Sequence, residues 1–144
     1  MSTTVDYETD LHAWTKAQAD ALRRRAGNEI DYENIAEELE DLGSSHQSEI
    51  ESRLENLLLH LLKWKYQPSM QSGSWLSSII EARFRIVRVK ERNPSLKRYP
   101  GDCLADIYPT AKARAIAETG LVAGDIPDAC PWRIEDVLDD DFLP

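Results

Sequence analysis

The sequence predicts an all-α, single-domain helical bundle organised around one long helix over about residues 31–66. Apolar residues in this stretch recur with helical spacing. At 100° per residue, one stripe contains Ile35, Leu39, Leu42, His46, Ile50, Arg53, Leu54, Leu57, Leu61 and Trp64. A chain of 144 residues is also the size of one domain with one sizeable core. We therefore expect one helical domain over residues 1–144, with four main helices and short helical turns near the C-terminus.

A first helix is expected over about residues 7–25. Its apolar stripe consists of Tyr7, Leu11, Trp14, Ala21 and Leu22. Asp6 can cap the exposed amide groups at its start, and Gly27 with Asn28 favours a break after it.

The long helix has a clear start at Asp31, a good N-cap residue followed by acidic side chains that suit the positive end of the helix dipole. Gly43 could interrupt it, because glycine costs about 1 kcal/mol in a helix interior. The apolar stripe keeps its register across Gly43, so we expect one continuous helix. Between Leu57 and Leu62 the apolar residues spread around the helix, which predicts that other helices surround this half.

A third helix is expected from Ser74, after the break at Pro68, to Arg92. Its apolar arc contains Leu76, Ile79, Ile80, Phe84, Ile86 and Val87, and its opposite face contains Arg85, Arg88 and Arg92. Arg83 falls within the apolar arc, so its guanidinium needs an acceptor or a route to solvent.

The last third of the chain contains three expected helical segments. A short turn over 95–99 precedes a fourth helix over about 102–119, which Pro109 either kinks or begins. Gly120 favours the end of that helix, and a short helix follows over 133–138. Residues 139–144, DDDFLP, form an acidic and apolar tail that either docks on the domain or stays free.

The charge balance opposes some classes of function. A formal net charge of −9 disfavours general binding to nucleic acid or anionic membranes, which depends on surplus Lys and Arg. We see no signal peptide and no apolar run long enough to span a membrane, so the expected location is the cytoplasm. Cys103 and Cys130 are expected to be free thiols.

Three histidines raise the possibility of a metal site, because imidazoles on neighbouring helices are common ligands. On one helix His46 and His60 are separated by roughly 21 Å at 1.5 Å per residue, so they cannot share an ion. The alternative metal set is His12, His46 and Glu49. Histidines with ordinary hydrogen bonds are the preferred interpretation, and we expect no metal and no cofactor.

Two other clusters are candidate ligand sites. His46, Glu49, Arg53 and Arg83 could meet between the second and third helices, either as structural ion pairs or as an anion or small-molecule pocket. The expected ion pairs are Arg53 with Glu49 and Arg83 with Glu55. At the other end, His60, Trp64, Tyr66 and Trp75 could form an aromatic plug or a pocket.

A basic run forms a third candidate surface. It contains Arg83, Arg85, Arg88, Lys90, Arg92, Lys97 and Arg98, interrupted by Glu91, whereas an acidic run contains Glu37, Glu38, Glu40 and Asp41. This asymmetry is compatible with docking of an acidic partner or nucleic acid, but a solvated face balanced by nearby carboxylates is the preferred interpretation.

Five segments carry a family resemblance: YETDLHAW (7–14), ENIAEELEDLG (33–43), SRLENLLLHLLKWKYQP (52–68), AETG (117–120) and DFLP (141–144). In this order, and over nearly the whole chain, they resemble the bacterial family known as domain of unknown function twenty-nine. The resemblance implies a small all-helical protein without an assigned activity or known catalytic residues. His60, Lys63 and Trp64 fall within the HLLKW run typical of that family.

The sequence thus favours a non-enzymatic protein-interaction module that binds another protein or itself. The alternative is a small-molecule or metal-dependent enzyme that uses the polar cluster around His46 or the aromatic pocket around His60. An enzyme would need a concave site with perturbed acids or bases, whereas an interaction module would need an exposed apolar patch, for example at Trp132, Phe142 and Leu143.

Overall fold

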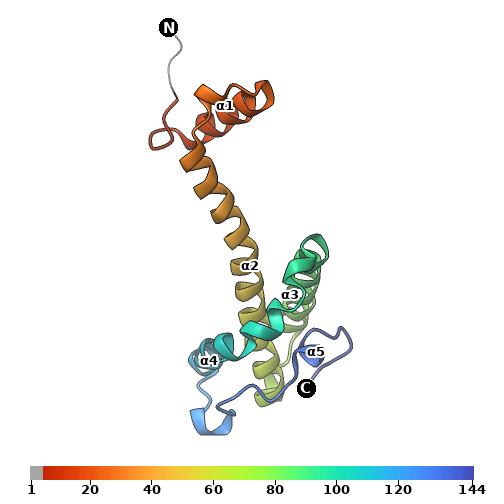
Figure 1. Cartoon of the computed structure of the whole chain (residues 1–144). Helices are drawn as coiled ribbons and strands as arrows, with labels where there is room; N and C mark the ends of the chain where they lie inside the picture. Colours follow the sequence, from red (N-terminus) through yellow and green to blue (C-terminus); the bar gives the residue numbers. More distant parts are fainter. Residues whose placement is uncertain (1–4) are drawn as a thin grey trace. The chain divides into compact units, whose positions relative to one another are not determined.

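The computed structural model describes residues 5–144, and these residues form an all-α bundle with no strand (Figure 1). The helices are α1 (Leu11–Arg24), α2 (Tyr32–Tyr66), α3 (Gly73–Arg92), α4 (Tyr99–Thr119) and α5 (Ile134–Val137). Short 3₁₀ turns lie between them. The predicted fold class is confirmed. The helix α2 also runs through Gly43 without interruption, as the register of its apolar stripe predicted.

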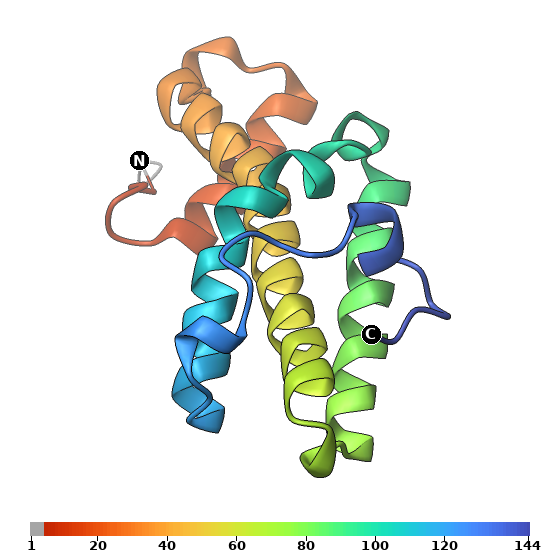
Figure 2. The same cartoon turned by 90° about the horizontal axis from the view of Figure 1, so that it is seen from below.

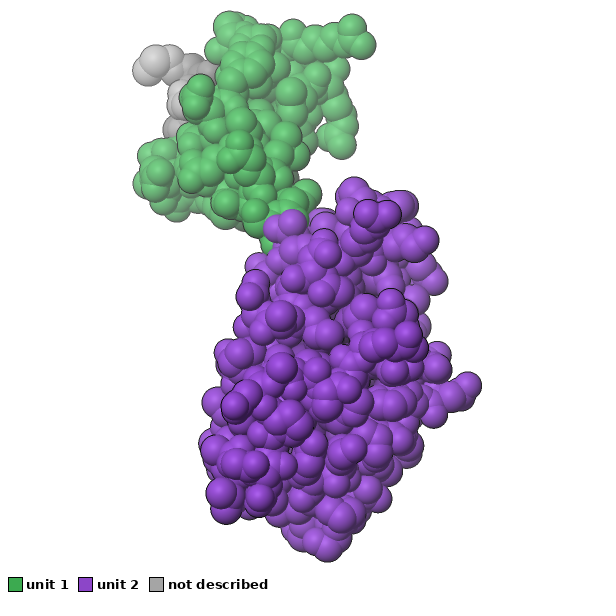
Figure 3. Space-filling model, turned by 60° about the horizontal axis from the view of Figure 1, so that its bottom comes forward, with its two compact units in different colours: residues 1–44 green, residues 45–144 purple. Residues whose placement is uncertain are grey.

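The described chain divides into two compact units, residues 1–44 and 45–144 (Figure 3). Residues 32–44 of α2 belong to the first unit and residues 45–66 to the second. That the whole chain folds as one cooperative domain stays a prediction.

In the first unit, hydrogen bonds surround the buried side chain of Trp14 and connect α1 to the start of α2. The side chain of Asp10, rather than Asp6, caps α1 by accepting a hydrogen bond from the amide of Ala13. Trp14 is buried, and its indole Nε1 donates to Asp31 Oδ2 over 3.2 Å. Asp31 also accepts hydrogen bonds from the amide and the side chain of Asn34, which confirms Asp31 as the N-cap residue before α2. These carboxylate contacts lower the pKa of Asp31 despite some loss of solvation, so they favour its charged form.

The second unit has its core around the second half of α2, which lies between α3 and α4 (Figure 2). Leu57, Leu58, Leu59, Leu61 and Leu62 are all buried, although Leu57 and Leu59 face nearly opposite directions. Burial on every side confirms that other helices surround this half of α2. Each such leucine contributes about 1.5–3 kcal/mol of transfer free energy, so this segment stabilises the unit most.

The starts of α3 and α4 also shift from the prediction, for reasons of local chemistry. Ser72, not Ser74, caps α3 through the amide of Trp75. The helix α4 begins at Tyr99 because Pro100 is accommodated in its first turn, where no amide donor is needed, and Pro109 lies inside the helix. Gly120 ends α4 with φ of +73°, the left-handed conformation that glycine adopts without strain. Cys103 and Cys130 are free thiols, as predicted.

None of the described helices combines the length and the apolar composition that crossing a membrane requires.

Candidate functional site

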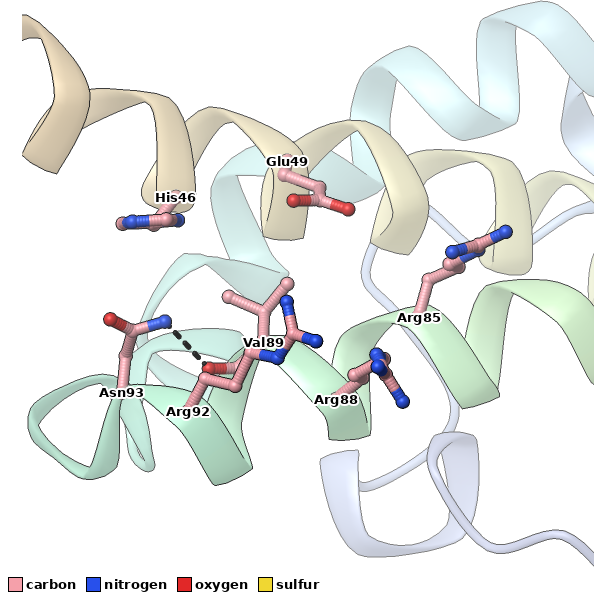
Figure 4. A pocket seen from close by; sticks show the side chains of 7 residues that line it. All are labelled: His46, Glu49, Arg85, Arg88, Val89, Arg92 and Asn93. Carbon is pink, nitrogen blue, oxygen red and sulfur yellow. Dashed lines mark hydrogen bonds between the residues drawn. The ribbon is translucent and has the colours of Figure 1, made fainter.

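A small groove between α2 and α3 contains two of the predicted site residues. His46 and Glu49 lie on α2, Arg85, Arg88, Val89 and Arg92 lie on α3, and Asn93 directly follows α3 (Figure 4). The groove encloses about 120 Å³. That volume suits a carboxylate or a similarly small anion better than a drug-sized molecule. We call this site the basic groove.

The spacing of residues on α3 explains how the basic groove forms. Arg85, Arg88 and Arg92 are separated by three and four positions, so they share one face of the helix. Val89 is buried on the neighbouring face and forms part of the groove lining. Asn93 ends the helix, and its side-chain amide donates to the carbonyl oxygen of Val89 over 2.9 Å (Figure 4). The arginines therefore project from a rigid, capped helix.

The basic groove has a surplus of positive charge. Its lining contains three arginines and one carboxylate, Glu49. Arg85 Nε lies 3.9 Å from Glu81 Oε1, but both side chains are about half exposed, and such ion pairs contribute little. The arrangement favours an additional carboxylate from a partner.

Exposed apolar side chains lie next to the arginines. Ile80 and Phe84 are 59% and 55% exposed. They line a hollow of about 270 Å³ together with Val87, Arg83 and Asp140. The guanidinium carbons of Arg85 and Arg88 lie 5.9 and 6.0 Å from the Phe84 ring centre. We define these five residues, Ile80, Phe84, Arg85, Val87 and Arg88, as the α3 patch.

The exposure of the α3 patch corrects part of the predicted apolar arc. Ile79 and Ile86 are buried as expected, whereas Ile80 and Phe84 are exposed. The predicted apolar arc extends over two faces of α3, but α2 packs against only one of these faces. The prediction also placed Arg85 and Arg88 on the face opposite the arc, whereas their guanidinium groups lie about 6 Å from the Phe84 ring centre.

Arg83 does not belong to the cluster around His46, in contrast to the prediction. Its side chain is only 2% exposed and donates to three backbone carbonyls near the C-terminus. The bonds reach Val137 (2.9 Å), Phe142 (2.7 Å) and, more weakly, Asp140 (3.5 Å). Burial lowers the pKa of the Arg83 guanidinium, and the nearby charges of Asp140 and Asp139 oppose that shift. The segment 139–144 is thereby held against α3, where Phe142 also makes an edge contact with Trp132.

The expected ion pairs of this cluster were also wrong. Arg53 Nη1 lies 3.8 Å from Glu81 Oε1 on α3, so it pairs between helices rather than with Glu49 along α2. Glu55 pairs with Arg114 of α4 at 2.8 Å instead of with Arg83. Sequence spacing identified groups that needed partners, but it could not identify which helix would supply them.

At the C-terminal end of α2, aromatic side chains pack against the core of the second unit. Trp64 and Tyr66 are partly buried against it, and Lys63 Nζ lies 4.6 Å from the ring centre of Trp75. His60 Nδ1 lies 2.8 Å from the carbonyl oxygen of Asn56, and burial lowers the pKa of the imidazole. A ligand role for His60, Trp64 and Trp75 stays a prediction.

No group of three or more His, Cys, Asp and Glu side chains within residues 5–144 could hold a metal ion. The alternative set is divided between the units, with His12 in the first and His46 and Glu49 in the second.

A family comparison agrees with these observations. The family model described as "Domain of unknown function DUF29" matches residues 7–143. The chain belongs to the DUF29 family. No curated protein and no solved structure matches this DUF29 chain. The match extends from Tyr7 in the first unit to Leu143 beside the Arg83 contacts, so both units and the α3 patch fall within it.

Proposed function

We propose that this DUF29 protein is a non-enzymatic protein-interaction module whose binding surface is the α3 patch. One observation carries the proposal: two large apolar side chains, Ile80 and Phe84, are more than half exposed and stand beside arginines. Aromatic residues and arginine are enriched in the buried centres of protein interfaces. Exposure of Ile80 and Phe84 to water costs free energy that a partner would recover.

The chemistry of the α3 patch also defines the partner surface. The apolar stripe of Ile80, Phe84 and Val87 would contact apolar side chains, and Arg85 with Arg88 would contact carboxylates. Both requirements are met by an amphipathic helix with an acidic flank, which is a common form of helix-in-groove recognition. A basic helix with the same apolar stripe would be repelled.

The test uses two designed helical peptides that share one apolar stripe and differ only in acidic or basic flanks. Fluorescence anisotropy should show binding of the acidic peptide to the full chain and weaker binding as salt increases. Phe84→Ser and Arg88→Glu should each reduce that binding. The control variant Arg23→Glu makes the same charge change on an exposed position of α1 and should bind normally. Equal binding of both peptides, or binding of neither, would refute the proposal.

The enzyme alternative from the sequence stays a hypothesis. The basic groove and the aromatic end would be its sites, but the favoured chemistry of the groove is recognition of a carboxylate.

A further inference from the structure

The acidic charge of this chain is concentrated at one end. Residues 1–44 contain eleven Asp and Glu residues but only four Lys and Arg residues, within a total net charge of −9. Five of these acidic residues lie on the first half of α2: Glu33, Glu37, Glu38, Glu40 and Asp41. Residues 1–44 therefore carry the negative charge that would complement Arg85 and Arg88 of the α3 patch.

The same half of α2 has an apolar stripe that remains accessible. Tyr32, Ile35 and Leu39 are separated by three and four residues and share one face of the helix. Tyr32 is 63% exposed and Leu39 is 64% exposed, while Ile35 is partly buried. Glu38 and Glu40 flank this stripe on its two sides, and Tyr7 donates a hydrogen bond to Glu38. We call residues 32–41 the acidic helix face.

We propose that the acidic helix face of one chain binds the α3 patch of a second copy, so that the protein associates with itself. This inference rests on the proposed function, because it names the partner of the same patch. Apolar stripes of equal length would meet, since Tyr32 to Leu39 and Ile80 to Val87 each span seven residues, roughly 10 Å along a helix. Glutamates on one helix would then face Arg85 and Arg88 on the other.

Each chain has one acidic helix face and one α3 patch, so each copy can supply both partners of the contact. A reciprocal pair related by a two-fold axis contains the contact twice and closes the assembly. In such a pair the two contacts would strengthen each other, because the second contact forms within a complex that the first already holds together. Self-association of this kind is expected to weaken with salt, since solvent screens the charged contacts.

The experiment measures the mass of the full chain by analytical ultracentrifugation over a range of concentrations and salt. A concentration-dependent dimer at low salt is expected. Reversal of the patch charges uses Arg85→Glu with Arg88→Glu. Reversal of the helix charges uses Glu33→Arg with Glu40→Arg, two exposed glutamates seven positions apart on one flank of the stripe. Each reversal should raise the dimer Kd by about tenfold or more. Leu39→Ser should also weaken the dimer, whereas the control pair Lys16→Glu with Arg23→Glu should not. Circular dichroism checks that each variant is folded.

The decisive step is to mix the two charge-reversed variants. In the mixed pair the acidic helix face of the patch-reversed chain meets an unchanged patch, and the reversed helix meets the reversed patch. Opposite charges therefore face each other at both contacts, and the heterodimer should form with nearly the unmodified affinity.

Two outcomes would overturn the inference: a monomeric mass at every concentration, or no recovery in the mixture. If the chain is monomeric yet still binds the designed acidic peptide, the self-association proposal fails and the proposed interaction function stands. If it neither associates nor binds that peptide, both fail.

Discussion

The replacement Arg83→Met tests whether a buried arginine holds the C-terminal segment in place. Methionine keeps much of the apolar stem of Arg83 but cannot donate to the carbonyls of Val137 and Phe142, which receive short bonds of 2.9 and 2.7 Å. A hydrogen bond from a charged donor contributes about 1.5–3 kcal/mol, and the longer contact to Asp140 adds little. Two such bonds give an expected loss of about 3 kcal/mol in the free energy of unfolding.

In other proteins, a well-packed apolar group has replaced a buried ion pair without loss of stability. Here the acceptors are backbone carbonyls, which remain in the variant and lose their donor. Urea unfolding followed by circular dichroism measures the loss. Release of the last residues by a carboxypeptidase should become faster, since the segment 139–144 loses its anchor.

The control is Arg85→Met, a half-exposed arginine on the same helix, which should change stability by no more than about 0.5 kcal/mol. Equal stability of the Arg83→Met and Arg85→Met variants, together with unchanged carboxypeptidase release, would refute the proposed anchoring role.

Four further predictions concern the core, the long helix, the tyrosines and the domain organisation. Leu57→Ala should cost about 3–5 kcal/mol in urea unfolding because it leaves a cavity at a fully buried site; a loss below 1 kcal/mol would contradict the assigned core. Gly43→Ala should stabilise by about 1 kcal/mol, because an added Cβ meets nothing within 4 Å; a lower melting temperature would contradict a helical Gly43. A hydrogen bond to Glu51 and burial raise the pKa of Tyr99 from 10.0 to about 12. The folded state therefore keeps this proton at pH values where the unfolded chain loses it, so the free energy of unfolding should fall as the pH rises from 10.0 to about 12. The fall should be smaller in Tyr99→Phe. If the chain is one cooperative domain, hydrogen exchange of backbone amides in the two units should report one common unfolding midpoint, and two midpoints would establish separate domains.

Local chemistry in the sequence determined the helices and most of their ends. The register of the apolar stripe correctly predicted that α2 continues through Gly43. Asp31 caps the start of α2 and Gly120 ends α4, and both effects were predictable because a cap acts within about one helical turn. The wide distribution of leucines over 57–62 also predicted the core correctly, because apolar side chains on all sides of a helix require neighbours on all sides.

The candidate site was only partly predictable. His46 and Glu49 were recognised as polar residues at the edge of a stripe, and the arginines of α3 as one basic face, but their meeting in the basic groove required the packing of two helices. Arg83 had the same sequence signal as Arg53, a charge on or near an apolar stripe, yet its acceptors lie more than fifty residues away along the chain.

The sequence by itself thus determined which surfaces of each helix are apolar, basic or acidic. Only the tertiary structure decided which of those surfaces are covered: Ile79 and Ile86 contribute to the core, while Ile80 and Phe84 on the same helix remain exposed. The physical reason is that periodicity along a helix is a local property, whereas burial depends on the few faces that neighbouring helices can reach.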